Sequence, residues 1–236
     1  MDTAWKERNS CALFDSPFCL SLHYAFETED KLISVFELKP GITLRWRWPH
    51  NKKFPNNIKT KAWLAAMALG VKEMKDKNVV HLDGHPDNMM TDELGYPVWI
   101  DFGCSQTGIT EPDKGGSWHI IGWPGGHIPE TRENQRNGKK QHGYMSDWYI
   151  YGHYFYSALA GHRMDHKSRE ADVECKAENE KHIKKDAKDI IRKLTEFDPL
   201  KRLGINGWSD IRDHPFFKEI DWEKVQNREY DLSGLP

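Results

Sequence analysis

The stretch that decides the fold is VVHLDGHPDNMMTDELGYPVWIDFG, residues 79–103. It contains two polar motifs, HLDGHPDN at residues 81–88 and DFG at residues 101–103, and each follows a short apolar run. Aspartate, asparagine, glycine and proline are common in turns, so a plain hairpin is the simplest interpretation of either motif alone. Together, however, the two motifs at this spacing form a much more specific signal than either motif alone.

The order and spacing of the two motifs resemble the protein-kinase pattern H-R-D-L-x-x-x-N followed by D-F-G. In phosphoryl transfer that pattern supplies a carboxylate near the attacking hydroxyl and oxygen ligands for Mg²⁺ on the nucleotide phosphates. The resemblance implies that Asp83 is the catalytic base and that Asn88, in the same catalytic loop, binds Mg²⁺ together with Asp101. It also gives His85 the position of a catalytic-loop lysine. A neutral imidazole there would contribute little charge near pH 7.

The composition excludes several classes of function. The chain has 236 residues, 38% of them hydrophobic, which is enough for one large domain or two small ones. The formal net charge of −2 gives no electrostatic argument for binding nucleic acid or a membrane surface. No apolar run is long enough for a membrane span. The N-terminus lacks the apolar core of a signal peptide and the cysteines are scattered, so we expect a cytoplasmic protein with reduced thiols.

The N-terminal part resembles one particular group of kinases. After a helix end in residues 1–16, the segment SPFCLSLHYAFETEDKLISVFELKPG contains two strand-like runs separated by the turn residues ETED. This segment resembles the fourth and fifth strands and the hinge of AGC-group serine/threonine kinases. The resemblance implies that Phe36 is the gatekeeper and that the backbone from Glu37 to Lys39 binds the adenine edge of ATP. It also implies that Met90 is the floor of the adenine site.

Further motifs follow in the order of the family. Residues 54–77 are expected to form a helix with one apolar stripe, and residues 104–130 an activation segment. Asp147 is expected to cap a helix, to hold the backbone of the catalytic loop, or both. Arg202 is expected to form a buried ion pair with Glu130, and loss of either partner would cost about 3–5 kcal/mol.

The resemblance divides the chain into three parts. Residues 1–40 would be a remnant of the small lobe with the hinge, residues 41–218 the large lobe, and residues 219–236 the start of an AGC-type C-terminal extension. The segment DHPFFKEIDWEK is most similar to delta-like members of protein kinase C. The expected fold is therefore α+β and protein-kinase-like, with a truncated β-rich small lobe and a mainly α-helical large lobe.

The chain also departs from the family's pattern. Counting back from Pro17 places the family's helix glutamate near Asp2, and no glycine-rich loop or strand lysine comes before it in the sequence. Leu82 replaces the arginine of H-R-D, and His119 occupies the matching phosphoacceptor position. We therefore expect the isolated chain to bind ATP–Mg²⁺ weakly.

Three interpretations of the function are left open by the sequence. The first is a protein serine/threonine kinase, similar to protein kinase C, that uses ATP and Mg²⁺ to phosphorylate a protein. The second is a pseudokinase that serves as a binding or scaffold module for a protein partner. The third is a gene fragment that lacks the glycine-rich loop and the strand lysine.

Overall fold

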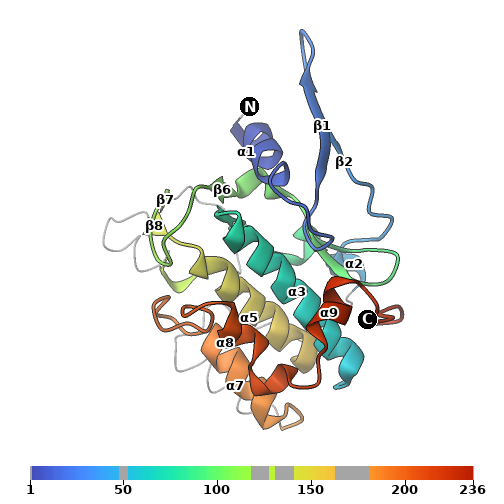
Figure 1. Cartoon of the computed structure of the whole chain (residues 1–236), viewed down its shortest axis with the longest axis vertical. Coiled ribbons are helices and arrows are strands. Elements are labelled where there is room, and N and C mark those ends of the chain that lie inside the picture. Colours follow the sequence, from blue (N-terminus) through green and yellow to red (C-terminus); the bar gives the residue numbers. More distant parts are fainter. Residues whose placement is uncertain (1, 48–52, 118–127, 131–140, 163–180, 236) are drawn as a thin grey trace.

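The computed structural model describes residues 2–47, 53–117, 128–130, 141–162 and 181–235 of the chain. A small N-terminal part with one helix and one hairpin stands beside a larger body built mainly of helices (Figure 1). Much of the expected activation segment, including His119, lies outside the described residues. Within the described ranges, no helix is both long enough and apolar enough to cross a membrane.

The N-terminal part consists of helix α1 (Asp2–Cys11) and the antiparallel strands β1 (Leu22–Glu27) and β2 (Leu32–Phe36). The hairpin extends away from the body (Figure 1), and its side chains are exposed or only partly buried. Only its base is attached to the body, where Leu20 N donates to Trp99 O at 2.9 Å.

Short antiparallel strand pairs flank the loops of the body that contain the two polar motifs. Strand β3 (Val79–Val80) pairs with β6 (Gln106–Thr107), β4 (Met89–Thr91) with β5 (Pro97–Trp99), and β7 (Gly116–Ser117) with β8 (Gln141–His142). The 3-10 turns η1 (Pro86–Asn88) and η2 (Phe102–Cys104) lie within the two polar motifs. The first motif runs from β3 to β4 and the second from β5 to β6, so the strand pairing brings the two motifs together.

Several further helical segments belong to the body (Figure 1). They are α2 (Leu44–Arg47), α5 (Met145–Ala160), α7 (Lys185–Leu194), α8 (Trp208–Arg212), the turn η3 (Pro215–Phe217) and α9 (Trp222–Gln226). Helix α5 begins close to the activation segment and packs against α7. Its C-terminus is closed by Gly161, whose φ of 80° is the left-handed conformation that glycine adopts without strain.

Helix α3 (Ile58–Asp76) is the centre of the body. Asn57 caps it, because its side chain accepts a hydrogen bond from Thr60 N at 3.1 Å. The expected apolar stripe, which includes Met67, is buried. Burial extends beyond the stripe to Trp63 and Ala65 on other faces, because β5, α5 and α9 all pack against this helix. A helix that is covered on most sides is a core helix.

The predicted ion pair between Glu130 and Arg202 is present. The Arg202 guanidinium donates to both carboxylate oxygens of Glu130, each at 3.0 Å, and its side chain is 0% exposed. Arg202 also donates to Met145 O at 2.6 Å, at the start of α5. The pair therefore ties the end of the activation segment to the large body.

The C-terminal residues fasten onto the turn between β4 and β5. Arg228 Nη1 lies 2.9 Å from Asp92 Oδ2, whose side chain is fully buried. Leu232 N donates to Leu94 O at 3.2 Å, and the Leu232 side chain is buried. The segment expected to begin a C-terminal extension is therefore packed against the body up to the end of the described residues.

Candidate active site

The catalytic loop is held in place by Asp147. Its Oδ2 accepts from His81 N at 2.8 Å and its Oδ1 from Leu82 N at 3.3 Å. Leu82 has a φ of 67°, a strained conformation for a branched side chain, so the loop needs this external support. The role as a clamp is confirmed, whereas the cap interpretation is wrong, because Tyr144 occupies the N-cap position of α5.

Burial of the Asp147 side chain has an electrostatic consequence. Burial raises the pKa of the carboxyl group, while the electrostatic interaction with His81 and the two backbone hydrogen bonds act in the opposite direction. A buried carboxylate is tolerated here because backbone amides satisfy both of its oxygens.

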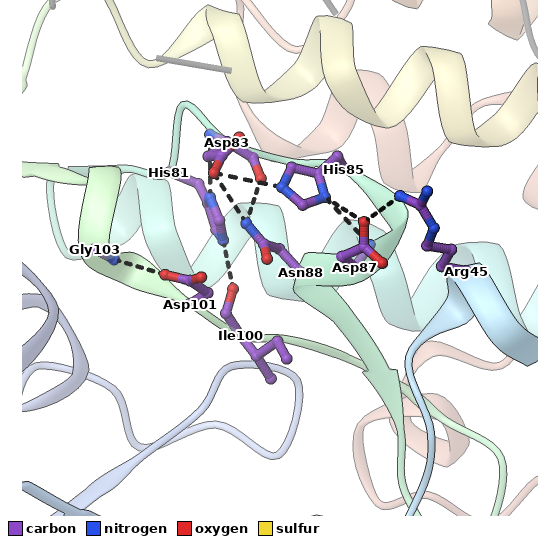
Figure 2. A network of polar contacts seen from close by, with 9 residues as sticks. All are labelled: Arg45, His81, Asp83, His85, Asp87, Asn88, Ile100, Asp101 and Gly103. Atoms are coloured by element: carbon purple, nitrogen blue, oxygen red, sulfur yellow. Dashed lines mark hydrogen bonds and ion pairs between the residues drawn. The ribbon is translucent and has the colours of Figure 1, made fainter. Parts of the chain in front are cut away.

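His81 links the two motifs. Its Nε2 lies 2.9 Å from Ile100 O, and its Nδ1 accepts from Asp83 N at 3.3 Å. A carbonyl oxygen can only accept, so the hydrogen of the ring is on Nε2. Phe102 packs against the same ring, with a centroid distance of 4.6 Å. The loop that carries Asp83 is thus joined to the segment around the DFG motif by the hydrogen bond to Ile100, drawn in Figure 2, and by the ring contact with Phe102.

Asp83, the predicted base, is oriented by Asn88. The Asn88 amide nitrogen donates to Asp83 O at 3.0 Å and to Asp83 Oδ2 at 3.1 Å. Burial acts to raise the pKa of the Asp83 carboxyl, but the hydrogen bond and charge of His85, the electrostatic interaction with His81 and the hydrogen bond from Asn88 outweigh it and lower the pKa. Asp83 is therefore an ionised acceptor whose position is set by its neighbours.

His85 lies between two carboxylates. Its Nδ1 accepts from Asp87 N at 3.2 Å, so in the neutral form its hydrogen is on Nε2, which lies 3.5 Å from Asp83 Oδ2. The hydrogen bond to Asp83 raises the pKa of His85, while burial opposes the change. The sequence expectation of an imidazole with little charge near pH 7 therefore understates the positive charge beside Asp83.

Asp101 begins the DFG segment in an unusual backbone conformation. Its φ of 58° and ψ of 74° are left-handed, and its Oδ1 accepts from Gly103 N at 3.2 Å. Phe102 is buried between His81 and Phe14, whose ring centroid is 4.7 Å away. Burial of Phe102 anchors the segment and leaves the neighbouring Asp101 exposed at the site.

The predicted metal ligands suit a small hard cation. Asn88 uses its amide nitrogen for Asp83, which leaves its amide oxygen for a ligand. Asn88 ends the turn η1 and Asp101 precedes the turn η2, and Figure 2 shows the two side chains near each other. In the described part of the chain, no three His, Cys, Asp or Glu side chains gather into a metal cluster. One amide and one carboxylate match a Mg²⁺ ion that takes its other ligands from phosphate and water.

A further acidic residue, Glu7, reaches the site from helix α1. Burial, and then the charge of Asp101, raise the pKa of the Glu7 carboxyl. The expectation of a helix glutamate near Asp2 is therefore not supported, since Glu7 is the α1 carboxylate near the DFG segment. The helical period offered a signal: Thr3, Glu7 and the fully buried Cys11 share one face of α1.

The predicted hinge residues lie at the end of the hairpin and directly after it. Phe36 ends β2 and packs against the core, and Glu37 N donates to Ser21 O at 3.2 Å. The Lys39 side chain is buried and its Nζ lies 2.6 Å from Glu37 Oε1. Thr43 then forms an isolated antiparallel bridge with Met90, which joins the segment after the hinge to the proposed adenine floor.

Comparison with known proteins gives the class of the chain. The sequence profile of the protein kinase domain matches residues 1–217, so the chain belongs to the protein kinase family. The α+β, protein-kinase-like fold expected from the sequence is thereby confirmed.

The relatives in this family are serine/threonine kinases. A probable serine/threonine-protein kinase of Dictyostelium discoideum is 30% identical over 98% of this chain and 50% of its own length. The serine/threonine-protein kinase sgk-1 of Caenorhabditis elegans is 30% identical over 94% of this chain and 48% of its own length. A RAC family kinase homolog of D. discoideum is 30% identical over 98% of this chain and 51% of its length. The chain spans about half the length of these relatives.

Proposed function

We propose that the chain carries the catalytic residues of an AGC-group serine/threonine kinase, similar to protein kinase C, which transfers the terminal phosphoryl group of ATP to a protein hydroxyl. The observation that carries this proposal is the network in which Asn88 and His85 orient Asp83 next to the DFG aspartate, Asp101. The family match and the serine/threonine kinase relatives support it. A cytoplasmic location stays a prediction.

In this proposal Asp83 receives the hydroxyl of the substrate. Its lowered pKa keeps the carboxylate ionised, so it can accept a hydrogen bond from the hydroxyl and then take the proton. Asn88 fixes the carboxylate, and His85 donates to it from the other side. The positive character of His85 would favour the transferring phosphoryl group, as the lysine of the family does.

The remaining residues have roles toward ATP and Mg²⁺. Asn88 and Asp101 would hold Mg²⁺, which neutralises phosphate charge when bound. The backbone of Glu37 to Lys39 would bind the adenine edge, with Phe36 as the gatekeeper and Met90 as the floor of the adenine site. Glu7 would be the helix carboxylate that pairs with the strand lysine of the family.

A pseudokinase that acts as a binding module is the second candidate. The observation that favours it is the apolar surface of the hairpin, where Tyr24 is 70%, Phe26 53% and Val35 40% exposed. The register pairs Tyr24 with Val35 and Phe26 with Ile33, so these side chains share one face. Exposed apolar faces of this kind commonly mark interaction sites.

Phosphoryl transfer from labelled ATP to a general protein substrate tests the proposal. Asp83→Asn should lower the rate by about 10²–10⁴-fold, the usual contribution of a general base. Asp30→Asn, at the exposed tip of the hairpin, is the matched control and should keep the wild-type rate. Transfer that survives Asp83→Asn would remove Asp83 as the base.

Thermal stabilisation by ATP separates the two candidates. Stabilisation that requires Mg²⁺ and disappears in Asp101→Asn is expected if the proposed ligands are correct. Stabilisation by ATP with no transfer by the wild-type chain would favour the binding module.

A further inference from the structure

Arg45 stands at the outer end of the polar network. Its Nη1 donates to Asp87 Oδ2 at 2.8 Å, and its side chain is 55% exposed. Figure 2 shows it reaching the catalytic loop from helix α2. In the described part of the chain, no hydrogen bond or ion pair of its Nε or Nη2 is found, so Asp87 holds the guanidinium through Nη1 alone.

The network continues from Arg45 to the proposed base. Asp87 Oδ2 lies 3.5 Å from His85 Nδ1, and His85 Nε2 lies 3.5 Å from Asp83 Oδ2. Arg45 therefore lies on the same side of the catalytic loop as Asp83. An extended peptide advances about 3.3 Å per residue, so a substrate whose hydroxyl meets Asp83 passes within a few residues of Arg45.

The charges along this row favour an anion at its outer end. Asp87 Oδ2 already faces two basic groups, Arg45 and His85, which weakens its attraction for a third cation. Among the described residues, Asp87 is the one acidic partner of Arg45, whose side chain is more than half exposed and has further donors. A guanidinium held by one edge is pre-oriented to bind a carboxylate or phosphate with the other. An exposed ion pair contributes little to folding, so stability alone gives no reason for it.

We propose that Arg45, oriented by Asp87, forms an anion-binding subsite for the protein substrate. The subsite would select a carboxylate or phosphorylated side chain within about three residues of the phosphoacceptor. This inference rests on the proposed function, because it takes Asp83 as the point where the hydroxyl lies.

Peptide binding tests the subsite without requiring transfer. Fluorescein-labelled serine peptides that differ only in a Glu, Gln, Lys or phosphoserine beside the serine would be titrated with the chain and followed by anisotropy. The Glu peptide should bind about tenfold more tightly than the Gln peptide, a typical effect of one charge-assisted contact. The phosphoserine peptide distinguishes the two anion sources.

The variants decide whether Arg45 is responsible. Arg45→Ala should abolish the preference for Glu over Gln, and Arg45→Lys should retain part of it because charge without the planar fork remains. Arg212→Ala, which removes another exposed arginine from an ion pair, with Asp213, is the matched control and should keep the preference. An unchanged preference in Arg45→Ala, or tighter binding of the Lys peptide by the wild type, overturns the subsite.

Failure of the subsite and failure of the kinase function give different results. A Glu preference that depends on Arg45 in a chain without transfer supports the subsite and contradicts the proposed activity. Transfer that requires Asp83 but has the same substrate preference in Arg45→Ala supports the activity and contradicts the subsite.

Discussion

The hairpin β1–β2 and helix α3 are both rich in apolar residues, yet their environments are opposite. Tyr24 and Phe26 of β1 are 70% and 53% exposed, whereas Leu64 and Met67 of α3 are fully buried. Helix α3 is covered by β5, α5 and α9, while the hairpin meets the body at its base. An apolar pattern therefore predicts the type of element, and the surrounding layers decide whether its side chains are buried.

The two halves of the candidate site are anchored differently. The polar groups of the candidate site are anchored in the body, through Asp147 and the strands that flank the two motifs. The hinge residues, by contrast, follow directly from the exposed hairpin. We infer that the catalytic loop is the more rigid half of the site.

The largest expected effect is loss of the buried ion pair in the body. Arg202→Met leaves the buried Glu130 carboxylate without its partner, so we expect the free energy of unfolding to fall by about 3–5 kcal/mol. Urea denaturation measures it. Arg212→Met, in an exposed pair, is the control and should leave the midpoint unchanged. A small effect of Arg202→Met would mean that the body is less tightly packed than its burial indicates.

Mild acid should also lower the free energy of unfolding, because His142 is buried in its neutral form. This side chain is fully buried, and burial lowers its pKa to about 4. Between pH 6.5 and pH 4 the unfolded chain binds more protons than the folded chain, so stability falls as the pH falls, by up to about 1.4 kcal/mol per pH unit. His142→Leu should reduce this slope in urea denaturation at pH 7, 6 and 5. His214, whose pKa burial also lowers, supplies a remaining slope of the same sign.

A small addition to the central helix should be harmful despite its helix propensity. A Cβ at Gly70 would lie 2.4 Å from Trp99 Cδ1 and 3.1 Å from Phe18 O. Propensity alone predicts that Gly70→Ala stabilises a helix by up to about 1 kcal/mol. Overpacking predicts a loss of about 1–3 kcal/mol, which we expect to dominate. A stabilised Gly70→Ala variant in urea denaturation would show that Trp99 and its neighbours can repack around the added methyl group.

The smallest expected effect concerns the hairpin. Tyr24→Ser and Phe26→Ser remove exposed side chains, so each should change the free energy of unfolding by no more than about 0.5 kcal/mol. A loss comparable with that of a core substitution would show that this face is covered in solution, and the contrast with α3 would disappear.

Several features of the site could be predicted from the sequence because they are local or have a distinctive spacing. The positions of Asp83, Asn88 and Asp101 follow from two motifs; the structure joins Asn88 to Asp83 by a hydrogen bond and places Asp101 near them. The sequence predicted a helix over residues 54–77, and the structure forms it as α3 over Ile58–Asp76, where Asn57 is the cap. The ion pair of Arg202 and the clamp at Asp147 came from the family resemblance, and both are present.

Other features required the three-dimensional arrangement. Glu7 was missed because its role depends on how α1 packs against the DFG segment, 94 positions away from Asp101 in the sequence numbering. The raised pKa of His85 depends on three carboxylates, of Asp83, Asp87 and Asp101, and a sequence cannot place them at a given distance. The contact of Arg45 with Asp87 joins segments that no motif connects.

The sequence by itself determined the family, the polar motifs and the type of most elements, because these depend on residue order, period and local turn chemistry. Only the tertiary structure decided which charges meet and which apolar faces are buried. Ion pairs and burial depend on distances between segments that are far apart in the chain, and those distances exist only once the layers have packed.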